Sequence, residues 1–205
     1  MLIQQLAGKR CKVERRANSN KPVYAADEGV RWSFNISHHG DWVALVGHPH
    51  DRRPEPQVGI DVMDATELPP PPAVNTSAAV RDLLESLRSQ LSEGEWTQMM
   101  AIDGDGERLW RLYLLWTLKE SYIKGTGEGL RVRLSTVTFE PRPPEAGSVG
   151  WDVWSVFREG IELGDWRVLS RQLDHDYIIA IALPTSEPRL PIVLTSSHAS
   201  ALIIK

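Results

Sequence analysis

The chain has 205 residues, of which 41% are hydrophobic and 24% are charged, and its formal net charge is -4. This composition is typical of a folded globular protein, and the acidic balance argues against a general binder of nucleic acid or of anionic membranes. Cys11 is the single cysteine, so we expect neither an internal disulfide nor a cysteine metal site. No apolar run reaches the length of a membrane span, and the N-terminus lacks a signal-peptide pattern, so we expect a cytoplasmic protein.

A basic run lies between Gly8 and Lys21 and includes Arg16. Such a run is either a solvated face or the rim of a phosphate site, and taken alone it favours the solvated face.

Two strands are expected next, at residues 32–37 and 42–47, because their residues alternate or are rich in β-branched and aromatic side chains. The turn between them places Ser37 and His38 at a strand end, where functional side chains are often carried. The residues 48–50 that follow are expected to form a loop.

A third strand is expected at residues 57–63. Val58, Ile60 and Val62 face one side of this strand, whereas Gly59, Asp61 and Met63 face the other. Asp61 therefore projects from a buried strand. Asp64 falls on the opposite face, so we do not pair it with Asp61.

A proline-rich connector follows at residues 68–73, and residues 77–100 have the apolar spacing of an amphipathic helix. Within that stretch, Ser92 is followed by Glu93 and Glu95, which resembles a helix restart with acidic residues near its N-terminus.

The helix expected around residues 109–124 is the centre of the chain. Its apolar residues lie on nearly all sides, which predicts that neighbouring elements cover it. Glu120 and Lys124 are spaced i, i+4 and could be an ordinary solvated pair. A buried carboxylate, however, is costly without a compensating cation, which favours a functional site. Glycines at 125, 127 and 129 end the helix.

Residues 134–139, 151–157, 166–173 and 177–183 are expected to be strands, and their short connections predict antiparallel pairing. Residues 184–205 contain one apolar run, at 190–194, and no recognisable chemistry. The pattern as a whole predicts an α+β fold.

Three segments occur in a fixed order: Phe34–His38, Val58–Asp61 and Trp116–Lys124. Together they resemble the 4′-phosphopantetheinyl transferases of the surfactin-synthetase-activating class. The similarity is greatest to the eukaryotic aminoadipate-semialdehyde dehydrogenase phosphopantetheinyl transferases, because Met63 stands where bacterial relatives usually carry a second acid. Each motif alone is weak, whereas all three in order are specific.

The resemblance implies a holo-[acyl-carrier-protein] synthase, a transferase that moves phosphopantetheine from coenzyme A to a serine of an acyl or peptidyl carrier domain. Adenosine 3′,5′-bisphosphate is released. Asp61 and Glu120 match the family's Mg²⁺ ligands, with water expected in place of a ligand at Met63. Glu120 is the expected acceptor of the serine proton, and Lys124 matches the lysine that contacts the pyrophosphate. The residues expected to bind coenzyme A are Arg16, Lys21, Asn35, Ser37, His38 and Lys124.

The implied architecture is two pseudo-symmetric lobes of antiparallel sheet plus helices. We expect an incomplete N-terminal lobe at 1–57, a C-terminal lobe with the metal site at 58–183, and a tail at 184–205. The shortened first lobe leaves an alternative, a non-catalytic remnant that binds coenzyme A or a carrier domain. A third hypothesis is a metal-dependent phosphate hydrolase. Fatty-acid, polyketide, nonribosomal and aminoadipate-reducing carriers all remain open as partners.

Overall fold

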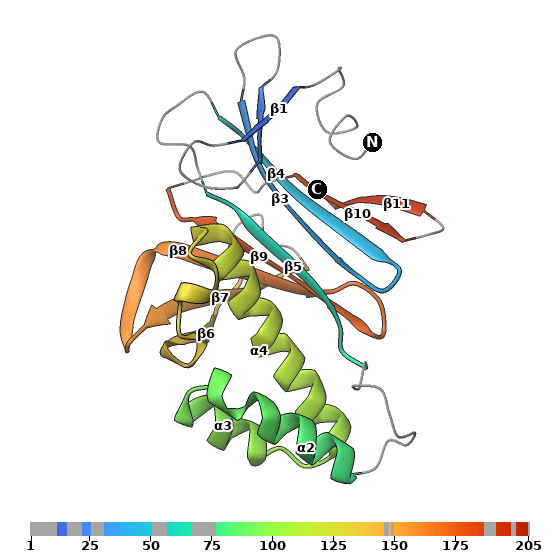
Figure 1. The fold of residues 1–205 in the computed structure, drawn as a ribbon, viewed down its shortest axis with the longest axis vertical. Helices are drawn as coiled ribbons and strands as arrows, with labels where there is room; N and C mark the ends of the chain where they lie inside the picture. Colours follow the sequence, from blue (N-terminus) through green and yellow to red (C-terminus); the bar gives the residue numbers. More distant parts are fainter. Residues whose placement is uncertain are drawn as a thin grey trace.

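The chain folds into two antiparallel sheets and a layer of helices, which confirms the expected α+β class (Figure 1). The computed structural model describes residues 12–15, 22–25, 31–50, 57–66, 77–145, 148, 150–186, 192–197 and 200–204.

The first sheet is built around a long hairpin. β3 (Arg31–His39) pairs with β4 (Trp42–His50) along its whole length, so the expectation of a loop at 48–50 was wrong. The reason is that these residues pair with 31–33 across the hairpin, and this long-range pairing overrides the weak strand propensity of Pro49. The sheet order is β1 (Lys12–Arg15), β2 (Pro22–Ala25), β3, β4, β10 (Ile192–Ser197) and β11 (Ser200–Ile204).

The C-terminal strands differ from the tail expected at 184–205. β10 pairs with β4, with Leu194 opposite Leu45, and β11 pairs with β10. A tail becomes part of the first sheet because β4 offers a strand edge that a distant apolar segment can pair with. Such pairing leaves no local signal in the sequence.

The second sheet has the order β5-β9-β8-β7-β6, so β5 is its outermost strand. Residues 134–136 form a 3₁₀ turn instead of the start of a strand. The strands are β5 (Gly59–Asp64), β6 (Val137–Arg142), β7 (Asp152–Arg158), β8 (Ile161–Gln172) and β9 (Tyr177–Pro184).

The helical layer corrects the expectation of a single helix over 77–100. α2 (Ser77–Leu87) is followed by the 3₁₀ turn Arg88–Gln90 and then by α3 (Glu93–Met100). The restart at Ser92 is confirmed: its Oγ accepts a hydrogen bond from Glu95 N at 3.2 Å, and a Glu95 carboxylate oxygen accepts one from Ser92 N at 2.9 Å. This capping box satisfies backbone donors that a continuous helix would not expose.

α4 (Asp105–Thr126) is the long helix of the molecule and ends at Gly127, which has a left-handed backbone. Within the described residues, no helix is both long and apolar enough to cross a membrane.

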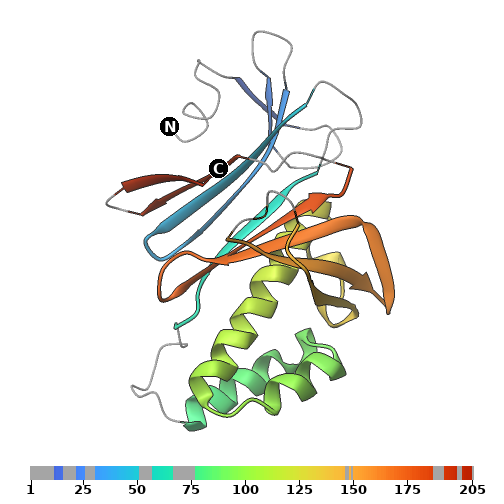
Figure 2. The same ribbon diagram turned by 180° about the vertical axis from the view of Figure 1, so that it is seen from behind.

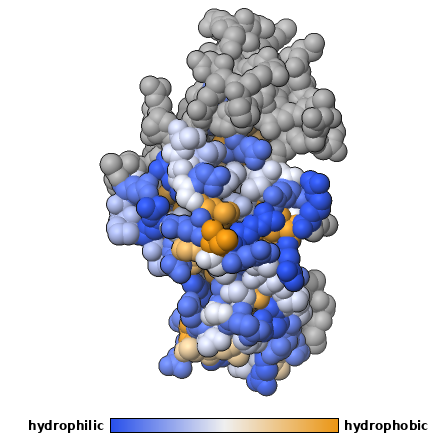
Figure 3. All heavy atoms as spheres, turned by 90° about the vertical axis from the view of Figure 1, so that its left-hand side faces the viewer, coloured by the Kyte–Doolittle hydropathy of each residue, from blue (hydrophilic) through white to orange (hydrophobic). Residues whose placement is uncertain are grey.

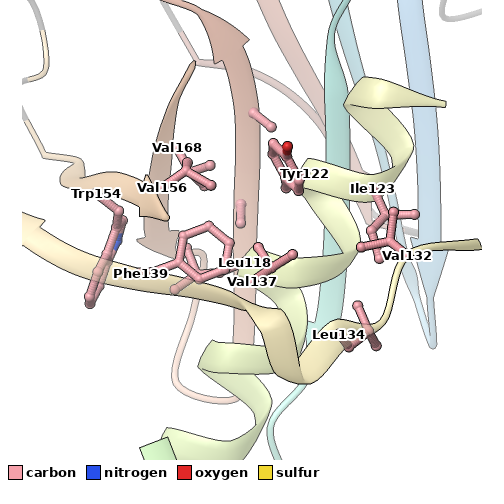
Figure 4. Close-up of a cluster of buried hydrophobic side chains, with 12 residues drawn as sticks. Leu118, Tyr122, Ile123, Val132, Leu134, Val137, Phe139, Trp154, Val156 and Val168 are labelled. Carbon is pink, nitrogen blue, oxygen red and sulfur yellow. The ribbon is translucent and has the colours of Figure 1, made fainter. Parts of the chain in front are cut away.

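The two sheets and α4 form successive layers (Figure 2). One face of the second sheet packs against the first sheet, through contacts of Val58, Ile60 and Val62 with Ala44 and Val46. The opposite face packs against α4 (Figure 4), where Leu118, Tyr122 and Ile123 meet residues of β6, β7, β8 and β9. Asp61 alternates with Ile60 and Val62, so it faces α4.

The lower part of the molecule, where α2 and α3 lie, is mostly hydrophilic on the face shown in Figure 3, and a small hydrophobic patch lies above it. α2 buries Val80 and Leu84 while its other side is exposed, as its amphipathic sequence predicts.

Candidate active site

β5 and α4 approach each other at two glycines. A Cβ atom on Gly59 would lie 2.8 Å from Gly125 Cα and closer still to Gly125 N and to the Ser121 carbonyl oxygen. Only glycine allows this separation between a strand and a helix. Asp61 lies two residues beyond Gly59 on the same face of β5, and Lys124 precedes Gly125. The close packing therefore brings the carboxylate and the ammonium group together.

Asp61, Lys124 and Ser37 form a connected polar cluster. Lys124 Nζ lies 2.6 Å from Asp61 Oδ1 and donates a second hydrogen bond to Ser37 Oγ at 3.0 Å. Ser37 Oγ in turn donates to Asp61 Oδ1 at 2.8 Å. Asp61 is only 6% exposed, so these contacts compensate a charge that is largely removed from water.

Ser37 can reach Asp61 because, among the described strands, β5 lies at the edge of the second sheet. Asp61 points toward α4. Ser37 belongs to β3 of the first sheet, and its side chain reaches Asp61 across the outer edge of β5. On an interior strand, a neighbouring strand would block this path. The edge position thus lets groups from both layers meet at one carboxylate.

Glu120 lies one helical turn before Lys124 and is half-buried. Its side chain makes no hydrogen bond or ion pair with the residues that the structure describes. Burial and the negative charge of Asp61 raise the pKa of Glu120, and the positive charge of Lys124 opposes them. Glu120 is therefore a carboxylate next to another carboxylate, with an incomplete set of partners.

Burial also raises the pKa of Asp61 above its ordinary value, although the charge and hydrogen bond of Lys124, the hydrogen bond of Ser37 and the charge of His39 oppose the shift. The effect of desolvation on the pKa of Asp61 is therefore larger than the opposing effect of Lys124. Two partly desolvated carboxylates and one ammonium group leave the site with surplus negative charge, which a cation would neutralise.

The donors at this site suit a hard cation. Carboxylate oxygens are ligands that Mg²⁺ prefers, and Mg²⁺ commonly binds proteins through one or two carboxylates while it keeps waters and phosphate oxygens. No group of three or more His, Cys, Asp or Glu side chains with metal-binding geometry occurs in the described ranges. Asp61 and Glu120 carry the carboxylates at this site that could serve as metal ligands, with other positions left to water.

The remaining residues expected at the site are placed differently. Asn35 lies beside β5, where its Oδ1 accepts a hydrogen bond from Ile60 N at 3.3 Å. His38 is exposed and, by strand alternation, lies on the opposite face of β3 from Ser37, so the structure does not bring it to Asp61. Arg16 and Lys21 lie outside the described residues. Met63 is partly buried and packs against the cluster that α2, α3 and α4 share.

Asp64 lies apart from Asp61, as expected, and accepts hydrogen bonds from Thr66 N at 2.8 Å and Thr66 Oγ1 at 2.7 Å. Partial burial acts to raise the pKa of Asp64, but hydrogen bonds from Thr66 and Tyr177 and the charge of His39 bring it below its ordinary value.

Sequence reasoning assigned no role to Lys119, which is fully buried beside Glu120. Its Nζ lies 2.9 Å from a Glu95 carboxylate oxygen and 2.9 Å from the Leu134 carbonyl oxygen, and it also donates to the Val137 carbonyl oxygen. Desolvation lowers the pKa of Lys119, and Glu95 opposes that shift. The signal available in the sequence was the apolar surface all round α4, which leaves a lysine at 119 no route to solvent.

The comparison with known families covers the second sheet and α4. Residues 57–182 match the family model of the 4′-phosphopantetheinyl transferase superfamily.

Curated relatives extend the similarity into the first sheet. The L-aminoadipate-semialdehyde dehydrogenase-phosphopantetheinyl transferase of Xenopus laevis is 32% identical over 176 residues, which cover 82% of this chain and 53% of the relative. The human protein of that name is 27% identical over 198 residues, with 89% and 59% covered. A phosphopantetheinyl transferase of Thraustochytrium is 27% identical over 193 residues, with 89% and 61% covered. The chain thus spans between 53% and 61% of the length of these relatives.

Proposed function

Because the chain belongs to the 4′-phosphopantetheinyl transferase superfamily, we propose that it transfers 4′-phosphopantetheine from coenzyme A to a serine of an acyl or peptidyl carrier domain. The reaction depends on Mg²⁺ and releases adenosine 3′,5′-bisphosphate, as in a holo-[acyl-carrier-protein] synthase. The observation that carries this proposal is the contact between Asp61 and Lys124, with Glu120 one turn away, at the free edge of β5.

Asp61 and Glu120 fit Mg²⁺, because they offer one buried and one half-buried carboxylate with surplus negative charge between them. When bound, Mg²⁺ would neutralise charge on the pyrophosphate oxygens of coenzyme A.

Lys124 is suited to bind the pyrophosphate. An ammonium group has three N–H donors, and two of them already point to Asp61 and Ser37. The third donor and the positive charge remain for a phosphate oxygen. The contacts with β5 and β3 fix the position of Nζ, so the donor is oriented before the substrate arrives.

Glu120 is the proposed acceptor of the serine proton. As the serine oxygen bonds to the β-phosphorus of coenzyme A, the bond from that phosphorus to the bridging oxygen breaks. That oxygen leaves on adenosine 3′,5′-bisphosphate, and the serine proton passes to Glu120, directly or through a water. A pKa raised by burial and by Asp61 makes Glu120 a stronger base than an exposed carboxylate.

The first carrier to test is the one that the names of the relatives suggest, the carrier domain of an aminoadipate-semialdehyde dehydrogenase. On that basis we propose a role in aminoadipate and lysine metabolism, with fatty-acid, polyketide and nonribosomal carriers as further candidates.

The test is incubation of the 205-residue chain with coenzyme A, Mg²⁺ and a purified carrier domain, followed by intact mass measurement of the carrier. Transfer adds one phosphopantetheine group to the carrier and produces adenosine 3′,5′-bisphosphate in equal amount. The same carrier with its acceptor serine changed to alanine is the control. Tight binding of coenzyme A without a mass change would indicate a binding protein, and cleavage of coenzyme A without a carrier would indicate a hydrolase.

A further inference from the structure

None of the described strands pairs with the outer edge of β5, and side chains of β3 cap this edge instead. Ile60 N donates to Asn35 Oδ1 and Val62 N donates to Ser37 Oγ, both at 3.3 Å. β3 and β5 belong to different sheets, so these contacts satisfy backbone N–H groups that would otherwise lie at an unpaired edge.

The two hydrogen bonds define a register. Each joins residues 25 positions apart in the sequence, so β3 and β5 run parallel and in step here, as the ribbons also show (Figure 1). Extending the register by two residues places His39 opposite Asp64, in agreement with the effect of the His39 charge on the pKa of that carboxyl group. In the other direction Ser33 falls opposite Val58, but its buried Oγ makes no hydrogen bond with any described residue.

The two anchored amides flank Asp61. Ile60 N and Val62 N point to the free edge, whereas Asp61 lies between them and pairs with Ala180 of β9. Ser37 holds one side of Asp61 and also contacts its carboxylate. Asn35 holds the other side, and within the described part of the chain its side chain hydrogen-bonds only to the backbone, at Ile60 N.

We propose that Asn35 is a positioning residue: its side-chain oxygen anchors Ile60 N, which fixes β5 so that Asp61 meets Lys124 and Glu120. This role differs from direct binding of coenzyme A. The proposal rests on the proposed function only where it concerns catalysis, because the anchoring of β5 is a property of the fold.

The test compares three variants of the full chain. Asn35→Leu removes the acceptor at similar volume, and Asn35→Asp keeps an acceptor oxygen but removes the amide donor. Ser33→Ala is the matched control on the same face of β3. The first readout is amide hydrogen exchange at Ile60 and Val62, which does not depend on activity. The second is binding of Mn²⁺ alone, followed by electron paramagnetic resonance.

We expect Asn35→Leu to speed exchange at Ile60 by about fivefold, as the loss of one hydrogen bond predicts, and to weaken Mn²⁺ binding. Exchange at Ile60 stays within about twofold of the parent chain in Asn35→Asp and in Ser33→Ala, since both keep the acceptor. If Asn35→Leu does not fold, amide exchange at Ile60 in Asn35→Asp tests the proposal instead. Unchanged Ile60 exchange in a folded Asn35→Leu, or fast exchange in Asn35→Asp, overturns the proposal.

Transfer to a carrier domain gives a third, separate readout. A positioning role predicts a fall in kcat together with the weaker Mn²⁺ binding in Asn35→Leu. A role in direct contact with coenzyme A predicts a higher KM with Ile60 exchange unchanged, and that result also overturns the proposal. If the parent chain modifies no carrier, the proposed function fails, while the exchange and Mn²⁺ measurements still decide the role of Asn35.

Discussion

Gly59 of β5 lies directly against Gly125 of α4, with a separation that leaves no room for a side chain on Gly59. The two residues are far apart in the sequence, yet their contact sets the distance between the strand that carries Asp61 and the helix that carries Lys124.

Gly59→Ala should therefore destabilise the fold, because its Cβ would meet backbone atoms of Ser121 and Gly125 that cannot move independently. We expect a loss of about 1–3 kcal/mol or more in the free energy of unfolding, measured by urea denaturation. Gly94→Ala is the matched control, since a Cβ there has open space, and it should be neutral or slightly stabilising. Equal stability of the two variants would show that β5 can shift away from α4.

Glu120→Gln should keep the fold and lose transfer, because in the proposed mechanism the charge of Glu120 binds the metal and accepts the serine proton. Removing a carboxylate that is repelled by Asp61 should also make the metal-free chain slightly more stable. Intact carrier mass and thermal unfolding measure the two effects. Transfer at the parental rate would refute the assignment of Glu120.

Lys124→Ala should weaken binding of coenzyme A more than binding of pantetheine, because only the former carries the pyrophosphate. Loss of one charge-assisted contact predicts a decrease of roughly tenfold or more in affinity for coenzyme A, measured by calorimetry. Arg131→Ala, at an exposed position next to α4, is the control for a general loss of positive charge. An equal loss for both ligands would contradict a contact with the pyrophosphate.

Lys119→Met should be strongly destabilising, because it leaves Glu95 buried without its ion-pair partner. Removing one partner of a buried pair typically costs about 3–5 kcal/mol. The double variant with Glu95→Gln should recover part of this loss, since a neutral amide can still accept from Ser92 N. Urea denaturation of the four proteins of this double-mutant cycle gives the coupling energy. Additive losses would mean that the pair is not coupled.

The raised pKa values of Asp61 and Glu120 predict how stability depends on pH in the absence of metal. In the window from the ordinary carboxyl value, about 4, up to the raised values, the folded chain binds more protons than the unfolded chain. Stability from these groups is therefore lost as the pH rises through that window.

At the proposed site Mg²⁺ competes with protons for the same oxygens, so the increase in Tm on adding Mg²⁺ should be larger at pH 8 than at pH 5. Asp61→Asn should remove most of this dependence on Mg²⁺. Met63→Ala should retain it, because a thioether is no partner for a hard cation. A Mg²⁺ effect that is the same at both pH values would argue against binding at these carboxylates.

The restart of a helix at Ser92 and the end of α4 at glycine were predictable because capping residues and glycine act through local backbone geometry. The strand carrying Asp61 was predictable from its alternation, and so was the separation of Asp61 from Asp64. Three motifs indicated the family, and the match of residues 57–182 to the family model confirmed it.

Only the tertiary structure placed β5 at the edge of its sheet, brought Ser37 to Asp61 across that edge, and directed Asn35 to the backbone of Ile60. It also paired Lys119 with Glu95, and it added β10 and β11 to the first sheet. Strand order and side-chain partners depend on contacts between distant segments. Hydrophobic periodicity and turn residues report how each segment is buried, but they do not report which other segment buries it.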